Sequence, residues 1–234
     1  MFVIIKRVAE TVKPTVGRGY AFLFPRAWKH RSELKFWKWL LEQDGHLGNL
    51  GYEKLFTDIF DLQRKDYNAK RVLDLGCGPC GSLEWADMTT QRVGLDPLAH
   101  DYLKLGADKH KMEYVAAGSE NIPFPDSHFD IVTCLNALDH VDDLDRTVRE
   151  IKRVVRRGGF FLVYVEIDHP PTATEPIAIN DTALKQKLGP EFEVVNEFRV
   201  GTPSDHNLHG AVAARSPAYV AGQPGVYVAR YLRM

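Results

Sequence analysis

The chain has 234 residues, of which 44% are hydrophobic and 26% are charged. These values are typical of a folded globular protein, so extensive disorder is excluded. Thirty Lys and Arg residues against 31 Asp and Glu residues give a net charge of −1 at pH 7, which argues against a dedicated nucleic-acid-binding protein. Three cysteines are too few for a disulfide framework. We therefore expect a protein of a reducing compartment, the cytoplasm.

The first 40 residues differ in charge from the rest of the chain. They contain nine Lys or Arg residues and two Glu residues, a net charge of +7 that leaves −8 for the remainder. Charged Lys6 and Arg7 follow the short apolar start, whereas a signal peptide has its charge first and a longer apolar run second. The basic segment predicts a solvated helix face on an acidic body, or contact with an anionic substrate or a membrane surface.

Two amphipathic helices are predicted next. Residues 32–43 place apolar side chains on one face at spacings of three and four, with Ser32 as a candidate N-cap. Residues 52–62 show a similar pattern. We therefore divide the chain into a basic segment with a helical cap, residues 1–65, and a main domain, residues 66–234.

From residue 70 onward, short apolar strands alternate with helical stretches. The predicted strands are 71–75, 92–96, 112–116, 129–135 and 160–165, and the predicted helices are 82–88, 97–105 and 144–155. This alternation is typical of a parallel sheet with helices on both faces. The apolar fifth strand fits a sheet that is buried on both sides.

The C-terminal part has a different pattern. A short helix is predicted over residues 181–188, and two strands over 191–200 and 225–232. Between these strands lies a long loop, residues 201–224, rich in Gly, Ala, Pro and His. A loop of this length is usually functional or mobile.

The segment Gly76-Cys-Gly-Pro-Cys-Gly81 follows the first strand and matches the pattern G-x-G-x-x-G. In a strand–turn–helix setting, the glycines allow a tight turn and a close approach of ligand to backbone. A following helix N-terminus favours polar or anionic groups. A phosphate-cradling nucleotide loop is excluded, because Gly81-Ser82 lacks the lysine that such loops need.

Two cofactor classes remain for this turn. A nicotinamide cofactor suits the glycines, and Asp96, twenty residues after Gly76, suits a ribose. However, Asp74 stands two residues before Gly76, where its carboxylate would repel a pyrophosphate. Asp74 suits a ligand with a positively charged amino group, such as S-adenosylmethionine. The sequence favours that ligand and keeps a nicotinamide oxidoreductase as an alternative.

Five segments resemble, in order and at family spacing, the motifs of the class I S-adenosylmethionine-dependent methyltransferases of type 11. They are residues 72–81, 93–97, 119–130, 138–143 and 153–161. The resemblance implies an α/β, Rossmann-like sheet of seven mostly parallel strands with a reversed C-terminal strand, helices on both faces and an N-terminal helical appendage. It also implies S-adenosylmethionine as the cofactor.

The resemblance further implies a set of cofactor-binding residues. They are Asp74, Gly76, Cys77 and Gly78 at the methionine end, Asp96 at the ribose hydroxyls, Pro97 on the adenine, Ser119 and Glu120 at the adenine edge, and Asn136 beside the methyl group. Gly118 departs from the family pattern, which commonly has an Asp that accepts from the adenine amino group. The departure predicts weaker cofactor binding, or a takeover by Ser119 or Glu120.

Two alternative uses of acidic and thiol side chains are less favoured. Cys77 and Cys80 have the spacing of a redox or metal pair, but no second pair exists in the chain. Asp139, Asp142 and Asp143 offer oxygen ligands for Mg²⁺, yet an Asp here is expected to cap the helix that follows. We therefore predict no metal site.

Several histidines are candidate general bases. His140 follows the fourth strand near the expected methyl group, and His206 and His209 lie in the long loop. Structural roles are favoured for each of them taken singly. The sequence leaves the catalytic residues open.

The function predicted first is methyl transfer to a small-molecule acceptor, such as a sugar or a lipid-linked intermediate. The helical cap and the 201–224 loop would cover the carboxyl ends of the strands and select the acceptor. One alternative is a catalytically silent cofactor-binding or regulatory partner, which Gly118 favours. A further alternative is a protein or RNA methyltransferase, which the net charge disfavours for RNA.

Overall fold

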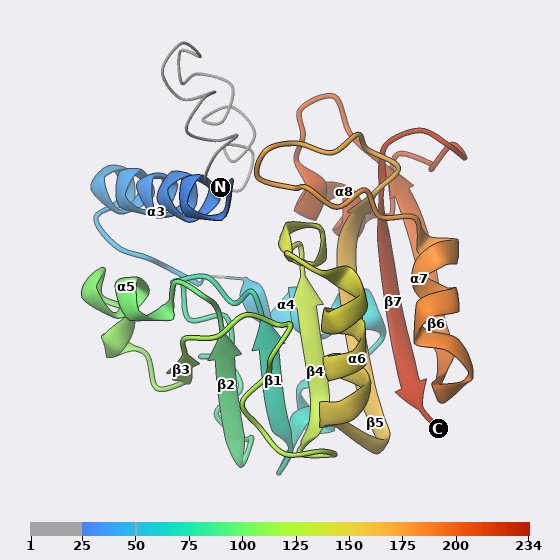
Figure 1. Ribbon diagram of the computed structural model, residues 1–234, viewed down its shortest axis with the longest axis horizontal. Helices are drawn as coiled ribbons and strands as arrows, with labels where there is room; N and C mark the ends of the chain where they lie inside the picture. Colours follow the sequence, from blue (N-terminus) through green and yellow to red (C-terminus); the bar gives the residue numbers. More distant parts are fainter. Residues whose placement is uncertain (1–24, 50) are drawn as a thin grey trace.

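The computed structural model describes residues 25–49 and 51–234 (Figure 1). Residues 1–24, which include much of the predicted basic segment, lie outside the described residues. Among the helices in the described part of the chain, none is both long and apolar enough to cross a membrane.

Strands and helices alternate along the main domain as the sequence predicts. The strands are β1 Arg71–Leu75, β2 Gln91–Leu95, β3 Glu113–Val115, β4 Phe129–Leu135, β5 Val155–Ile167, β6 Phe192–Gly201 and β7 Gly225–Arg233. The α-helices are α3 Pro25–Asp44, α4 Tyr52–Phe56, α5 Ala99–Lys104, α6 Leu144–Val154, α7 Asp181–Leu188 and α8 Leu208–Ala214. The 3₁₀ turns are η1 Asp58–Phe60, η2 Arg64–Tyr67, η3 Ala107–Lys109, η4 Leu138–His140 and η5 Gly189–Glu191.

The seven strands form one sheet in the order β3-β2-β1-β4-β5-β7-β6. The first five strands pair in parallel, and β7 runs antiparallel to both β5 and β6. The predicted fold class is therefore confirmed, including the reversed C-terminal strand. The carboxyl ends of β1, β2 and β4 meet at one edge of the sheet, where the chain turns out of each strand.

Each face of the sheet has its own hydrophobic layer, because successive strand residues point to opposite sides. Leu73 and Leu75 pack in the layer that holds α6 and α7, whereas Val72 packs in the layer that holds α4, η1 and α8. The first layer is closed by helix residues such as Ile151 and Leu184. The second is closed mainly by short turns, with Phe60 almost fully buried. The predicted helices on both faces are thus present, but they are shorter on the second face.

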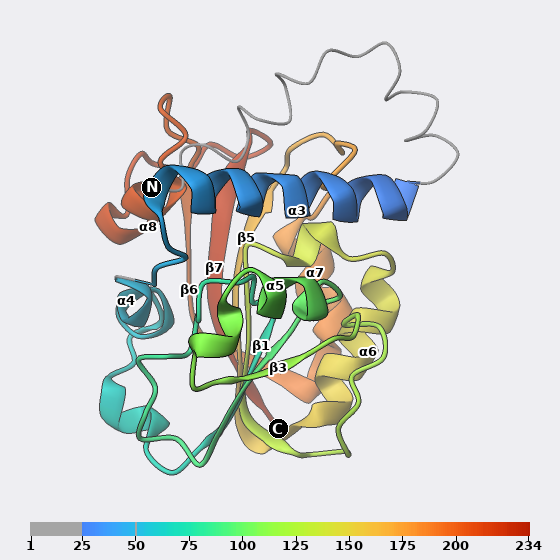
Figure 2. The same cartoon turned by 90° about the vertical axis from the view of Figure 1, so that its left-hand side faces the viewer.

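Helix α3 lies across the carboxyl edge of the sheet rather than against either face (Figures 1 and 2). Its apolar side chains Phe36, Trp37 and Leu40 pack against residues of the β2–β3 region, including Leu98 and Tyr102. The sequence predicts this helix from residue 32 with Ser32 as N-cap, but the helix starts at Pro25 and Ser32 lies within it. The prediction failed because the helix spans two turns more than its apolar stripe.

Two further predictions are corrected by the structure. No helix forms over residues 82–88, where the chain makes turns. Instead, Arg92 Nη1 donates a hydrogen bond to the carbonyl of Glu84 at 2.7 Å, and the Ser82 hydroxyl donates to Asp74. The Glu84 carbonyl and the Ser82 hydroxyl therefore make contacts other than those of a helix. Within the predicted loop 201–224, helix α8 forms instead, with Asn207 as its N-cap.

Candidate active site

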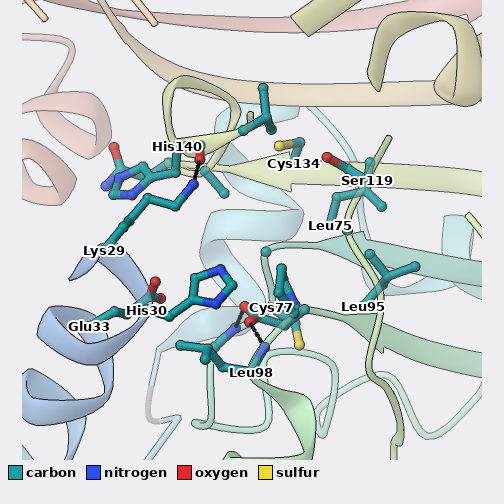
Figure 3. A pocket seen from close by; sticks show the side chains of 18 of the residues that line it. Lys29, His30, Glu33, Leu75, Cys77, Leu95, Leu98, Ser119, Cys134 and His140 are labelled. Carbon is teal, nitrogen blue, oxygen red and sulfur yellow. Dashed lines mark hydrogen bonds between the residues drawn. The ribbon is translucent and has the colours of Figure 1, made fainter. Parts of the chain in front are cut away.

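A cavity of about 620 Å³ opens at the carboxyl ends of β1, β2 and β4, beneath α3 (Figure 3). It is lined by all nine residues that the sequence predicts as cofactor contacts: Asp74, Gly76, Cys77, Gly78, Asp96, Pro97, Ser119, Glu120 and Asn136. The volume is in the range of small-molecule sites. The predicted residues therefore share one cavity, although they come from four separate segments of the chain.

The glycine turn after β1 leaves bare backbone against the cavity. Gly76 has a φ of +71°, and a Cβ at this position would lie 2.3 Å from the Cβ of Ala137. Gly78 has a φ of +58°, and a Cβ there would lie 3.2 Å from the ring of Trp37 on α3. A side chain is excluded at Gly76 by conformation and by space, and at Gly78 it would be strained by conformation and crowded by Trp37. No helix begins at Gly81, so the turn binds through its own amides without a helix dipole.

Asp74 is fully buried at the end of β1. Its Oδ1 accepts from Thr133 at 2.6 Å, and its Oδ2 accepts from Ser82 at 2.5 Å. Burial raises the pKa of this carboxyl to about 6, while the two hydroxyl donors oppose that shift. Near neutral pH the carboxylate is held in a fixed orientation at the cavity wall, as a negative group within reach of a cationic ligand.

Asp96 follows β2 and carries the most perturbed carboxyl of the cavity. Its Oδ1 accepts from the Leu98 amide at 2.9 Å, and its Oδ2 accepts from the Gly78 amide at 3.3 Å. Burial, followed by repulsion from the Glu33 carboxylate on α3, raises the pKa of Asp96 to about 8. Glu33 is held by Tyr102, whose hydroxyl donates to Oε1 at 3.0 Å. Hydrogen-bond donors on a ligand would stabilise the Asp96 carboxylate against repulsion from Glu33.

The turn after β3 shows how Gly118 is accommodated. A Cβ at Gly118 would lie 2.6 Å from Oε2 of Glu120, so the Glu120 carboxylate occupies the space of the missing side chain. The other oxygen of Glu120 accepts from the amides of Asp142 and Asp143. Ser119 instead shares a hydrogen bond of 3.0 Å with Thr147 on α6. Of the two residues expected to replace the family's Asp, Glu120 is the one placed to do so.

Asn136 comes directly after β4 in the left-handed conformation, with a φ of +53°. Its backbone amide donates to the carbonyl of Tyr164 at 2.6 Å, which connects the turn to β5. Its side-chain Oδ1 is buried and accepts no hydrogen bond from the described residues. A buried amide oxygen that faces a cavity without a donor is suited to a ligand that brings one.

The candidate histidines do not gather at one point. His140 lines the cavity on η4, His209 lines it on α8, and His206 is exposed outside it. Burial lowers the pKa of His209 to about 4, so its ring is neutral at pH 7 and lies beside the ring of Tyr164. The structural roles that the sequence favours for these residues stay predictions.

The acidic residues after β4 have separate uses. Asp143 accepts from the Arg146 amide at 2.9 Å and caps α6, as the sequence predicts. Asp142 pairs with Lys29 at 2.8 Å and with Arg26. The ion pair with Lys29 lowers the pKa of Asp142 against the effect of burial. The three aspartates therefore do not form the Mg²⁺ set that their spacing offers.

Three cavity residues on α3 were not predicted from the sequence. Lys29 is buried, and its Nζ donates to the carbonyl of His140 at 2.7 Å (Figure 3). Glu33 faces Asp96, and Trp37 covers Gly78. Glu33 carries a sequence signal, since it is the single acidic residue among the basic residues between Arg26 and Lys38. Lys29 and Trp37 reach the cavity because of where α3 docks, and no local sequence pattern predicts that position.

Comparison with known proteins agrees with this geometry. Residues 73–163 match the model of a methyltransferase domain. The chain is 34% identical over 100 residues to the sterol 4-C-methyltransferase strm-1 of Caenorhabditis elegans, covering 39% of this chain and 30% of that protein. It is 32% identical over 125 residues to the ubiquinone/menaquinone biosynthesis C-methyltransferase UbiE of Vibrio parahaemolyticus, covering 47% of this chain and 45% of that protein. The matches thus span less than half of these curated relatives.

A solved structure extends the comparison to the whole fold. An S-adenosylmethionine-dependent methyltransferase from Mesorhizobium loti superposes with a TM-score of 0.54 at 19% identity, over 72% of this chain and 93% of that one. This likeness concerns the fold. The proteins of the family that the domain match and the curated relatives indicate use S-adenosylmethionine as the methyl donor. Residues 73–163 therefore form a methyltransferase domain, and the chain has the fold of the class I S-adenosylmethionine-dependent methyltransferases.

Proposed function

We propose that this protein transfers a methyl group from S-adenosylmethionine to a small-molecule acceptor inside the cavity beneath α3. The observation that carries the proposal is the convergence of all nine predicted contacts on that one cavity. We further propose residues 66–234 as the catalytic domain and residues 1–65 as its cap, acting in the cytoplasm. The three cysteines are buried and free, which supports a reducing compartment.

The residues present fit the donor molecule. Asp74 and the turn Gly76–Gly78 would hold its methionine part, since the turn exposes backbone where no Cβ has room. Asp96 would accept from the two ribose hydroxyls, which would add charge-assisted hydrogen bonds to those from the Leu98 and Gly78 amides. The unpartnered Oδ1 of Asn136 would accept a further hydrogen bond.

The adenine would lie against residues of the β2 and β3 turns. Pro97 and Leu98 line this part of the cavity and offer apolar contact. Glu120 would take the place of the family's Asp at the adenine amino group, because its carboxylate fills the space above Gly118. Ser119 would contribute through its backbone, since its hydroxyl is bound to Thr147.

The bound donor supplies a sulfonium-activated methyl group that a nucleophile can displace in line. The chain contributes alignment and exclusion of water, which account for much of the rate in such transfers. Trp37 and Phe36 of α3 close the cavity above the glycine turn. A base is needed only for a weakly acidic nucleophile such as a hydroxyl.

The acceptor part of the cavity favours a largely apolar molecule. Trp28, Phe36, Tyr52 and Phe56 line it from α3 and α4. The curated relatives named above are named for a sterol and for ubiquinone or menaquinone, which are apolar molecules with an oxygen function. We therefore favour a lipid-linked acceptor over a free sugar. The cavity volume of about 620 Å³ supports a small molecule over a protein or RNA.

A catalytically silent, cofactor-binding partner is the second candidate function, and Gly118 is the observation that favours it. Both candidates require cofactor binding, and only the first predicts transfer of a labelled methyl group to a lipid extract. Retention of the cofactor without any labelled product would favour the silent partner.

The test of the cofactor assignment is the variant Asp96→Ala, measured by calorimetry with S-adenosylhomocysteine. Loss of two charge-assisted hydrogen bonds should cost about 3 kcal/mol or more, which corresponds to a Kd at least about 100-fold higher. Asp101→Ala is the matched control, since Asp101 is a partly exposed residue of α5 whose ion-pair partner within residues 25–49 and 51–234 is Lys104. An unchanged Kd for Asp96→Ala would contradict the ribose assignment.

A further inference from the structure

Three metal-ligating side chains meet beside the cavity. Asp139 and His140 belong to η4, and Glu175 belongs to the segment between β5 and α7. Each offers one donor atom, and these atoms all lie within 4.8 Å of one another. Asp139 is 1% exposed and Glu175 is 6% exposed. The cluster therefore joins two buried carboxylates from distant parts of the sequence to one imidazole at the cavity wall.

Asp139 has an unsatisfied carboxylate. Neither of its oxygens accepts a hydrogen bond from the described residues. The nearest side-chain nitrogens belong to imidazoles, with His140 Nε2 at 4.0 Å from Oδ1 and His169 Nε2 at 3.5 Å from Oδ2. A buried carboxylate without close donors is costly, and buried charges are usually paired or bound to a metal.

No stronger cation compensates this group of carboxylates. Within residues 25–49 and 51–234, no Lys or Arg pairs with Asp139 or Glu175. Glu175 accepts only from the hydroxyl of Thr172, at 3.2 Å. Among the described residues, the two buried carboxylates are thus approached only by imidazole nitrogens and one hydroxyl, which leaves space for a cation between them.

We propose that Asp139, His140 and Glu175 bind a divalent cation of the Zn²⁺ or Mn²⁺ class. One imidazole nitrogen and two carboxylate oxygens form a donor set that these ions accept. Donor atoms around a tetrahedral Zn²⁺ with bonds of about 2.1 Å lie about 3.4 Å apart. The donor atoms of Asp139, His140 and Glu175 lie within 4.8 Å of one another, and side-chain rotations that move them by about 1 Å would give that arrangement. This site replaces the expectation from sequence that the chain has none.

Neighbouring groups support the ligands in the way that outer-shell partners do in metal sites. His169 lies against Oδ2 of Asp139, and its Nδ1 lies 3.0 Å from the carbonyl of Pro170, which fixes the ring. The Ile177 amide donates to the carbonyl of Asp139 at 3.2 Å and holds the β5–α7 segment against η4. The backbone hydrogen bond from Ile177 to Asp139 therefore brings the two segments of the cluster together without using its side-chain donor atoms.

The position of the cation suggests its use. His140 and Thr174 line the cavity, so the open side of the cation would face the acceptor. There it would polarise an acceptor oxygen and favour its deprotonated form. This use rests on the proposed methyl transfer, whereas binding of the cation does not depend on it.

The test is titration of the EDTA-treated full chain with Mn²⁺, followed by the electron paramagnetic resonance signal of free Mn²⁺. We expect one Mn²⁺ bound per chain, displaced by Zn²⁺, which binds such donors more tightly. Glu175→Gln and His140→Gln should each weaken Mn²⁺ binding by about 10- to 100-fold or more. Asp143→Asn is the matched control, since Asn caps a helix as well as Asp and the residue lies outside the cluster.

Two results would overturn the proposal. One is the absence of saturable Mn²⁺ binding by the wild-type chain, and the other is equal binding by the wild type and both ligand variants. His140 is partly exposed, so His140→Gln stays informative even where Glu175→Gln fails to fold. Calorimetry with S-adenosylhomocysteine on the same EDTA-treated protein separates the two proposals. Cofactor binding without Mn²⁺ binding rejects the metal site alone, and Mn²⁺ binding without cofactor binding rejects the proposed function alone.

Discussion

The two halves of the cavity are built in different ways. The half proposed for the cofactor is formed by turns that directly follow β1, β2, β3 and β4, so the pairing of the strands places it. The half proposed for the acceptor is formed by α3, α4, the β5–α7 segment and α8, which lie far apart in the sequence. The first half is fixed by the sheet, and the second depends on a few side-chain contacts. We infer that the first tolerates little change and that the second is where acceptor specificity is free to vary.

The largest effect should come from breaking the rigid half at Gly76. A Cβ here meets Ala137 at 2.3 Å, and the φ of +71° is unfavourable for any side chain. Gly76→Ala should destabilise the fold by about 2–5 kcal/mol and abolish S-adenosylhomocysteine binding. Urea unfolding and calorimetry would measure the two effects.

Gly222→Ala separates backbone strain from close approach. Gly222 has a similar φ of +76° but nothing within 4 Å of its would-be Cβ. Gly222→Ala should lower the free energy of unfolding by only about 1 kcal/mol and leave S-adenosylhomocysteine binding intact. Equal losses of unfolding free energy in Gly76→Ala and Gly222→Ala would show that the glycine turn after β1 is sensitive to backbone conformation alone. The contact with Ala137 would then be unimportant.

The contrast between the halves also explains what the sequence could predict. Strands 71–75 and 129–135 were predicted at their observed bounds, because apolar runs next to Gly and Pro mark buried strands. The nine cavity residues followed from motifs at the strand ends. All of these signals are local, and the parallel sheet converts them into a shared edge.

The parts that the sequence did not predict depend on distant contacts. The helix expected over 82–88 is absent because the Glu84 carbonyl and the Ser82 hydroxyl form hydrogen bonds with Arg92 and Asp74 instead. Glu175 joins Asp139 only when the β5–α7 segment folds back on η4. Neither event leaves a periodic pattern in the chain, so periodicity and capping rules could not find them.

The next prediction concerns Glu33, the point where the halves meet. Because the pKa of Asp96 is raised to about 8 by burial and by Glu33, the free protein holds Asp96 protonated at pH 7. Ribose hydroxyls favour the ionised form, so S-adenosylhomocysteine binding should release a proton. Affinity should rise by up to about 10-fold per pH unit from pH 6 to 8 and then level off. Calorimetry in buffers of different ionisation enthalpy measures the proton released.

Glu33→Gln removes the repulsion and should shift this rise to lower pH, so that affinity at pH 6.5 increases. The stability of the free protein should follow the opposite trend. A raised pKa in the folded state gives stability that is present below the unfolded value near 3.8 and is lost as pH rises through about 8. A pH profile identical in the wild type and Glu33→Gln would show that the two halves are independent at this point.

The smallest effect is expected where α3 is tied down at its first turns. Lys29 is 8% exposed and donates to His140 and Asp142, whereas the Arg26 side chain is 67% exposed and reaches Asp142 from solvent. Lys29→Met should therefore destabilise the docking of α3 by about 1–2 kcal/mol, and Arg26→Met by about 0–1 kcal/mol. Hydrogen exchange of α3 amides would report both values, while cofactor affinity should change less than 3-fold, about 0.6 kcal/mol. If Lys29→Met instead lowered cofactor affinity as strongly as it loosened α3, the flexible half would be part of the cofactor site, and the division of the cavity proposed here would fail.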